Sequence, residues 1–154
     1  MSKLDICVIF GGVSTEHEIS LLSARNVIGS LDRERYRVWM VGITREGRWL
    51  LYEGDPAALP DDGWLDGPVC KAVLSPDACD HGLWIFRGGA PDLLHIDAAL
   101  IYLHGKCGED GTVQGVFALA GIPVAGCGLL ASALCMDKEL AHRVAEQAGI
   151  RVPR

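Results

Sequence analysis

The chain has 154 residues, of which 49% are hydrophobic, and its formal net charge is −6 at pH 7. This length fits one domain with a sizeable apolar core. The acidic balance argues against nucleic acid or an anionic membrane surface as a partner, and no apolar run is long enough to cross a bilayer. The six cysteines form no Cys-x-x-Cys pair and the N-terminus has no signal-peptide pattern, which favours a reducing, cytoplasmic location.

The N-terminal region predicts a strand, a turn and a helix. Residues 5–10 are a short apolar run that ends in Gly11 and Gly12, as a strand entering a tight turn does. Thr15 and Glu18 have the spacing of a capping box at the start of a helix. An apolar stripe with helical period follows at Ala24, Val27, Ile28 and Leu31.

The middle of the chain predicts further strands around one long loop. Residues 36–44 are expected to form a second strand and residues 49–52 a short third strand. Residues 53–69 are rich in Gly, Pro and Asp, which predicts a surface loop. Residues 70–74 and 82–86 are expected to pair as strands on either side of a Ser-Pro-Asp turn.

The C-terminal third returns to alternating strands and helices. Residues 96–103 predict a buried strand, residues 112–120 a helix and residues 121–126 a brief strand between glycines. Asp137 is placed to cap a last helix that Gly149 closes. The apolar positions of that helix are Leu140, Ala141, Val144, Ala145 and Ala148.

This order of elements predicts an α/β fold: a doubly wound, mostly parallel sheet with a small antiparallel insertion. Residues 150–154 resemble a connector that follows a helix. We therefore expect residues 1–154 to be one domain of a longer protein.

Residues 104–115 contain one His, one Lys, two acidic residues and several glycines, and they directly follow a predicted buried strand. In open α/β sheets ligands bind at the carboxyl ends of strands, so this loop is the first candidate for a site. The glycines of the chain do not form Gly-x-Gly-x-x-Gly, and no Walker lysine pattern is present, so a dinucleotide site is only weakly supported.

Each candidate residue has a functional and a structural interpretation. Glu16 can hold an ammonium group or simply complement the helix dipole. His104 can orient a substrate, exchange a proton, or be a structural histidine. Lys138 can contact phosphate or be a solvated helix lysine. Glu109 and Asp110 are better explained as fixing their loop, with Lys106 in a local ion network and with Asp110 or Thr112 capping the next helix.

Three segments, in this order and spacing, carry a family resemblance: residues 10–20 (FGGVSTEHEIS), 104–115 (HGKCGEDGTVQG) and 131–138 (ASALCMDK). They resemble the N-terminal, Rossmann-like pre-ATP-grasp domain of D-alanine–D-alanine ligases. Residues 72–77 and 81–83 are most similar to the vancomycin-resistance branch, whose members join D-alanine to D-lactate or D-serine.

The resemblance implies an ATP- and Mg²⁺-dependent ligase of peptidoglycan precursor synthesis that acts through an acyl phosphate. It implies that Glu16 and His104 act at the first D-alanine, with Ile19 beside the substrate methyl group, although a core position also fits Ile19. Lys138 would contact the ATP phosphates. The magnesium ligands and most of the nucleotide clamp would lie outside this chain, so the chain alone is expected to be inactive.

Relatives of this kind commonly form homodimers through this domain, and no nucleic-acid or membrane partner is expected. The alternative function is a stand-alone Rossmann-like module that binds a small acid or a nucleotide without catalysis.

Overall fold

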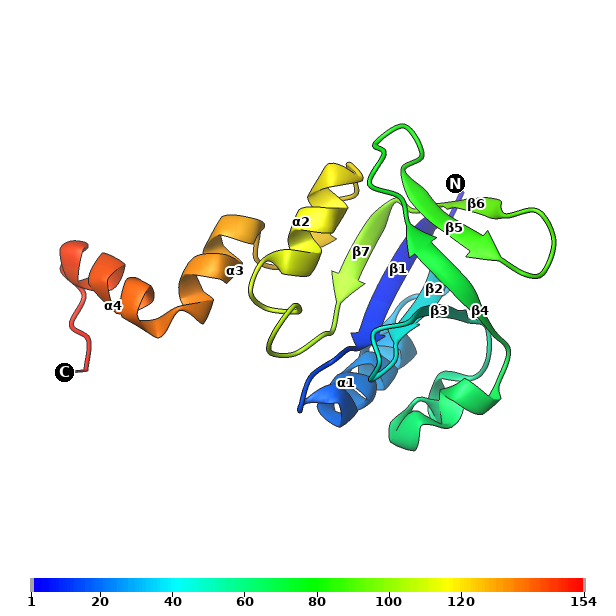
Figure 1. Ribbon diagram of the computed structural model, residues 1–154, viewed down its shortest axis with the longest axis horizontal. Helices are drawn as coiled ribbons and strands as arrows, with labels where there is room; N and C mark the ends of the chain where they lie inside the picture. The colour runs from blue at the N-terminus through cyan, green and yellow to red at the C-terminus, as the bar shows by residue number, and fades with distance from the viewer. Residues whose placement is uncertain (1, 154) are drawn as a thin grey trace.

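The computed structural model describes residues 2–153 and contains one eight-stranded sheet with helices packed on both faces (Figure 1). The strands are β1 (Leu4–Gly11), β2 (Tyr36–Ile43), β3 (Trp49–Tyr52), β4 (Val69–Leu74), β5 (Gly82–Phe86), β6 (Asp92–His95), β7 (Ala98–Ile101) and β8 (Val124–Ala125). Their order across the sheet is β6-β5-β4-β3-β2-β1-β7-β8. The predicted α/β class is confirmed.

The sheet has a parallel part and an antiparallel part. Strand β1 pairs in parallel with β2 on one side and β7 on the other, and β7 pairs in parallel with β8. Strands β3, β4, β5 and β6 extend the sheet beyond β2 as an antiparallel meander. The antiparallel insertion is thus larger than expected by one strand, β6, whose short exposed sequence gave no periodic signal.

Helices cover opposite faces of the parallel part, which confirms the doubly wound arrangement. They are α1 (His17–Ser30), α2 (Thr112–Leu119), α3 (Leu129–Met136) and α4 (Lys138–Gln147). Leu21, Ala24 and Ile28 of α1 pack into one apolar cluster with Val8 and Phe10 of β1. Val113 and Phe117 of α2 pack into a second apolar cluster, on the other face of the sheet.

Residues 53–69, predicted to be a surface loop, are largely at the surface but are not irregular, and Val69 already belongs to β4. They form two short 3₁₀ helices, Pro56–Ala58 and Pro60–Asp66, that lie against α1. Leu59 and Trp64 are fully buried, and the Trp64 ring meets Phe10 edge-to-face with 5.3 Å between centroids. Two side chains of the segment therefore belong to the core on the α1 face.

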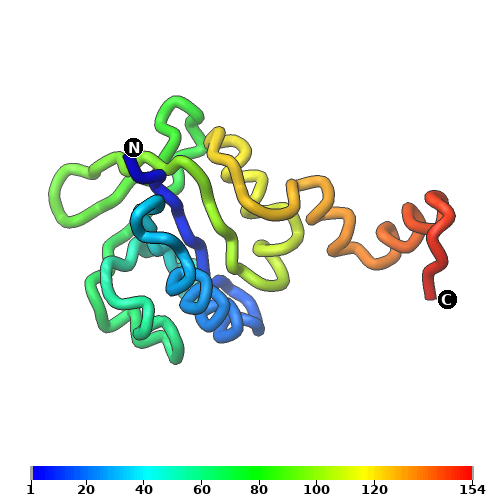
Figure 2. The backbone as a smooth tube through the Cα atoms, turned by 180° about the vertical axis from the view of Figure 1, so that it is seen from behind, coloured from blue at the N-terminus to red at the C-terminus, as the bar shows by residue number. Residues whose placement is uncertain are grey.

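Helices α3 and α4 extend away from the rest of the molecule, toward the C-terminus (Figure 2). The sequence predicted α4 and its Asp137 cap, and Asp137 indeed accepts hydrogen bonds from the amides of Glu139 and Leu140. Several large apolar side chains of this arm are exposed, namely Leu129, Leu130, Met136, Leu140, Val144 and Ile150. No helix in the described residues is long and apolar enough to cross a membrane.

Candidate functional site

Two loops meet at the carboxyl ends of β1 and β7, which are neighbouring parallel strands. The first loop leads from β1 to α1 and carries Glu16; the second leads from β7 to α2 and carries His104 and Glu109. One ligand atom from each of these three side chains lies within 4.8 Å of the other two. The structure thus brings together Glu16 and His104, the pair expected to act on substrate, and adds Glu109.

Glycines and a buried serine hold the first loop in place. Gly11 and Gly12 have φ values of 85° and 98°, which β-carbon-bearing residues avoid, and the Gly12 amide donates to the Ile43 carbonyl at 2.8 Å. Ser20, on the first buried turn of α1, accepts a hydrogen bond from the Gly11 amide and donates to the Tyr102 carbonyl. Ser20 therefore ties the start of both loops to α1.

The predicted capping box is wrong. Helix α1 begins at His17, and its N-cap, Glu16, makes no side-chain capping bond. Glu18 instead pairs with Arg45, with 3.1 Å between Oε1 and a guanidinium nitrogen. The Glu16 amide is held by Ser14 Oγ at 3.1 Å, while the Glu16 carboxylate has no protein partner among residues 2–153. That carboxylate is exposed and free to receive a ligand.

His17 is a structural residue that the sequence pattern did not reveal. Its side chain is fully buried, with Nδ1 2.7 Å from the Gly12 carbonyl and Nε2 2.9 Å from Asp62 Oδ1. Burial alone would raise the pKa of Asp62, but hydrogen bonds from His17, Arg45 and Trp64, together with the charge of His17, lower it below its usual value. This histidine connects the first loop to the 3₁₀ segment.

The second loop is fixed by carboxylates that accept from backbone amides, not by the ion network proposed from the sequence. Asp110 accepts from the amides of Cys107 at 2.8 Å and Thr112 at 3.0 Å, and these bonds lower the pKa of its carboxyl group. Glu109 Oε2 accepts from the Gly105 amide at 2.8 Å. Lys106 has no ion-pair partner within the described part of the chain.

Gln114, in the first turn of α2, braces the same loop. Its Nε2 donates to the Gly108 carbonyl at 2.7 Å, while its buried Oε1 has no hydrogen-bond partner among residues 2–153. His104 is half-buried, and its Nε2 lies 3.3 Å from Ser23 Oγ on α1. The second loop is therefore positioned by contacts with both α1 and α2.

A cavity of about 540 Å³ opens beside this cluster. His104 and Glu109 line it from the second loop, and Ser132, Cys135 and Met136 line it from α3. Glu16 stands outside the lining residues but next to His104. The cavity is large enough for a small amino acid.

Ile19 and Lys138, the two remaining candidate residues, are both exposed. The Ile19 side chain is 53% exposed, so the core position considered for it is wrong. Lys138 begins α4 and shares a shallow groove with Asp110 and Met136, which places it on the side of the second loop. Asp137 occupies the amides of the first turn of α4, so Lys138 would have to reach an anion with its side chain.

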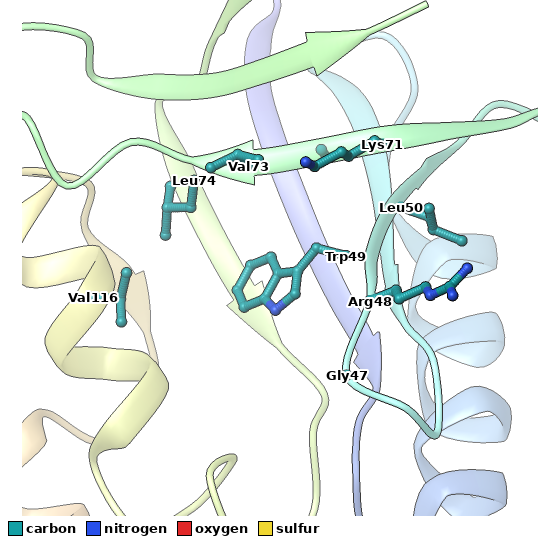
Figure 3. A pocket seen from close by; sticks show the side chains of 9 residues that line it. Gly47, Arg48, Trp49, Leu50, Lys71, Val73, Leu74 and Val116 are labelled. Carbon is teal, nitrogen blue, oxygen red and sulfur yellow. The ribbon is translucent and has the colours of Figure 1, made fainter.

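A second, separate groove of about 670 Å³ lies over β3, β4 and α2. Figure 3 shows the Trp49 ring extending from β3 toward Leu74 and Val116, with Arg48 and Lys71 near the rim. This groove is mainly apolar and contains none of the candidate residues.

The family described as "D-ala D-ala ligase N-terminus" matches residues 5–127. The chain belongs to this D-alanine–D-alanine ligase family. It is 46% identical over 150 residues to a D-alanine–D-alanine ligase of Caldicellulosiruptor bescii, a match that covers 97% of this chain and 41% of the relative. It is 44% identical over 153 residues to a putative D-alanine–D-lactate ligase of Streptomyces coelicolor, with 99% and 43% covered.

Solved structures of the family have the same fold. The VanG D-Ala:D-Ser ligase of Enterococcus faecalis superposes with a TM-score of 0.93 at 41% identity, over 99% of this chain and 44% of that chain. The D-alanine–D-alanine ligase of Coxiella burnetii superposes with a TM-score of 0.86 at 33% identity, over 99% and 44%. The chain therefore spans about two fifths of the length of the ligases that it matches.

Proposed function

We propose that this domain supplies the first-substrate side of a ligase that joins D-alanine to D-alanine, D-lactate or D-serine. The observation that carries the proposal is the free carboxylate of Glu16, held beside His104 at the carboxyl ends of β1 and β7. Membership of the ligase family supports the same function. The other groups needed for turnover would come from the rest of the protein.

Glu16 is suited to bind the ammonium group of the first D-alanine. An ammonium donates three hydrogen bonds, and a carboxylate without a protein partner accepts one of them as a charge-assisted bond. His104, oriented by Ser23, would accept or donate a hydrogen bond beside the substrate carboxylate. Ile19 follows on the first turn of α1 and would present apolar surface to the substrate methyl group.

In the proposed reaction, the carboxylate oxygen of the first D-alanine attacks the γ-phosphorus of ATP, which gives an acyl phosphate and ADP. The amine or hydroxyl group of the second substrate then attacks the acyl carbon, and inorganic phosphate leaves. We assign Lys138 to the phosphates of ATP, because it is exposed and unpaired among the described residues and lies on the side of the second loop.

Mg²⁺ belongs to the family's reaction, and it prefers oxygen ligands in octahedral geometry. The cluster that the described residues offer contains the imidazole of His104. It does not fit Mg²⁺, so we assign no magnesium ligand to this chain. We expect the reaction to take place in the cytoplasm. We also expect a homodimer that forms through this domain, and a mass that rises with concentration in sedimentation equilibrium would reveal it.

The test is Glu16→Gln in the full-length protein, with Glu18→Gln as the control that removes the same charge two residues away. Glu16→Gln should weaken use of the first D-alanine by roughly tenfold to a hundredfold, because a charged hydrogen bond becomes neutral. The KM for ATP should stay unchanged. If both variants show the same small effect on D-alanine, Glu16 is not at the substrate.

A further inference from the structure

The cluster of Glu16, His104 and Glu109 joins one imidazole to two carboxylates. Neither carboxylate has an ion-pair partner within residues 2–153. Two neighbouring uncompensated carboxylates attract a cation, and the imidazole determines which kind is preferred. Imidazole nitrogen is a ligand for Zn²⁺, Co²⁺, Fe²⁺ and Ni²⁺, whereas Mg²⁺ and Ca²⁺ prefer oxygen alone.

We propose that Glu16, His104 and Glu109 form a binding site for a divalent transition-metal ion. Each residue would supply one ligand atom, and water would complete the coordination. A site with three protein ligands and an open position is common for Zn²⁺. No established step of the family reaction requires this ion, so the site would be inhibitory.

Two contacts outside the ligand set orient these side chains. Ser23 Oγ lies 3.3 Å from Nε2 of His104, which leaves Nδ1 available as the ligand atom. The Gly105 amide donates to Oε2 of Glu109 at 2.8 Å, which leaves Oε1 free. Outer contacts of this kind fix ring orientation and carboxylate geometry at metal sites.

The separations in the cluster are close to those of a filled site. Zn²⁺ binds nitrogen and oxygen at about 2.0–2.2 Å, so two ligand atoms of a tetrahedral shell are roughly 3.3 Å apart. The three ligand atoms here lie within 4.8 Å of one another. Glu16 and Glu109 are exposed, and rotation of their side chains can close the remaining distance without moving the backbone.

Metal binding would compete with the first substrate, an inference that rests on the proposed function of Glu16. The same carboxylate cannot hold both an ammonium group and a metal ion. An ion at this site would also occupy His104. A transition metal would therefore raise the KM for the first D-alanine and leave the KM for ATP unchanged.

The first experiment titrates this chain with Co²⁺ and follows visible absorption, which reports coordination directly and needs no catalysis. One ion should bind per chain. His104→Ala, Glu109→Gln and Glu16→Gln should each weaken binding by at least about tenfold, because loss of even an outer partner costs that much. Excess Mg²⁺ should not displace Co²⁺.

Matched controls separate this site from general attraction to an acidic chain. Glu18→Gln and His142→Ala remove the same groups at exposed positions outside the cluster and should leave Co²⁺ affinity unchanged. Cys107 is an exposed thiol on the same loop, so Cys107→Ser should also leave it unchanged. Strong thiolate absorption that Cys107→Ser removes would overturn the proposal, as would a Co²⁺ affinity equal to that of the wild-type chain in all three cluster variants.

Circular dichroism of each variant checks the fold. Glu109→Gln keeps a carbonyl oxygen for the Gly105 amide, and Glu16 makes no side-chain bond to the described chain, so at least Glu16→Gln should stay folded. If Glu16→Gln is folded and binds Co²⁺ as the wild-type chain does, the proposal is wrong.

The second experiment measures initial rates of the full-length protein at several Zn²⁺ and D-alanine concentrations. Competitive inhibition against the first D-alanine supports the inference. If Co²⁺ binds but Zn²⁺ does not compete with D-alanine, the metal site is supported and Glu16 is not at the substrate. Absence of Co²⁺ binding would overturn the metal site and leave the substrate assignment to its own test with Glu16→Gln.

Discussion

His17 and Asp62 support the candidate site indirectly. We assign neither of them to the substrate, but their hydrogen bonds fix the loop that presents Glu16. His17 Nδ1 bonds the Gly12 carbonyl and Nε2 bonds Asp62. Both partner atoms are acceptors, and the ring is fully buried. Loss of either bond would leave a buried polar group unsatisfied, which is more costly than the bond itself is stabilising.

Asp62→Asn should destabilise the chain by about 1–3 kcal/mol at neutral pH, because the hydrogen bonds to a charged group become neutral. The native pKa of Asp62 is below its usual value of about 3.9, so its contribution is complete above that pH and disappears as the pH falls through the native pKa. Urea unfolding at pH 7 and at low pH checks this.

The difference between wild type and Asp62→Asn should therefore shrink on acidification. An undiminished difference at a pH below both pKa values would show that the carboxylate charge is not what stabilises the loop. Asp61→Asn, one residue away and without these bonds, is the control.

Lys138→Ala should impair phosphate contact while the fold is kept. Lys138 is exposed at the start of α4, and the Asp137 cap does not depend on it, so stability should change by less than about 0.5 kcal/mol. In the full-length protein the KM for ATP should rise or phosphoryl transfer should slow, since the interaction is electrostatic. A variant that melts much earlier yet uses ATP normally would make Lys138 a structural residue.

At the scale of single residues, the sequence predicted those site residues that belong to a recognisable local motif. Glu16 beside its glycines and His104 at a strand end could be identified, and the structure places them together. His17 and Ser20 could not, because their partners, Asp62 and Tyr102, are distant in sequence and only the fold brings them close. Glu109 was assigned to its loop, and its proximity to Glu16 likewise depends on the pairing of β1 with β7.

At the scale of elements, the segment at residues 53–68 shows where composition fails. Gly, Pro and Asp predict a loop, and locally that is correct, since the segment forms only 3₁₀ turns. Its burial is decided by tertiary contacts, because Leu59 and Trp64 complete the cluster under α1. Strand β6 and helix α3 were missed for a similar reason. Each is too short to show a clear periodic pattern, and its structure depends on contacts with neighbouring elements.

Gly42→Ala tests how tightly this segment packs on the sheet. A β-carbon at Gly42 would lie 2.4 Å from Trp64 Cη2 and 2.8 Å from Phe10 Cε2. Both rings are fully buried and cannot move away, so overpacking should cost about 1–3 kcal/mol. Gly29→Ala lies within α1, and no atom of the described residues is within 4 Å of the added carbon, so this change should be neutral or stabilising.

Thermal unfolding of both variants is the measurement. Equal melting temperatures for Gly42→Ala and Gly29→Ala would mean that the 3₁₀ segment does not hold Trp64 against β2 in solution.

At the scale of the whole molecule, the sheet and its two loops form one body, while α3 and α4 extend from it (Figure 1). The apolar side chains exposed on this arm include Leu130 at 78% and Ile150 at 61%. The chain spans about two fifths of the length of its ligase relatives. We propose that the remaining part of such a ligase packs against this arm and closes the site over Glu16 and His104.

The chain alone should therefore be folded but catalytically silent. Phosphoryl transfer from ATP requires several cationic groups and a bound metal ion around the γ-phosphate, and we assign only Lys138 of the described residues to the phosphates. Circular dichroism should show a cooperative unfolding transition, and incubation with ATP, Mg²⁺ and D-alanine should release no phosphate above background. Turnover in the range of ordinary enzymes, about 1–10³ per second, would show that the described residues already hold a complete active site. Tight binding of a small acid or nucleotide without turnover would instead favour a stand-alone binding module.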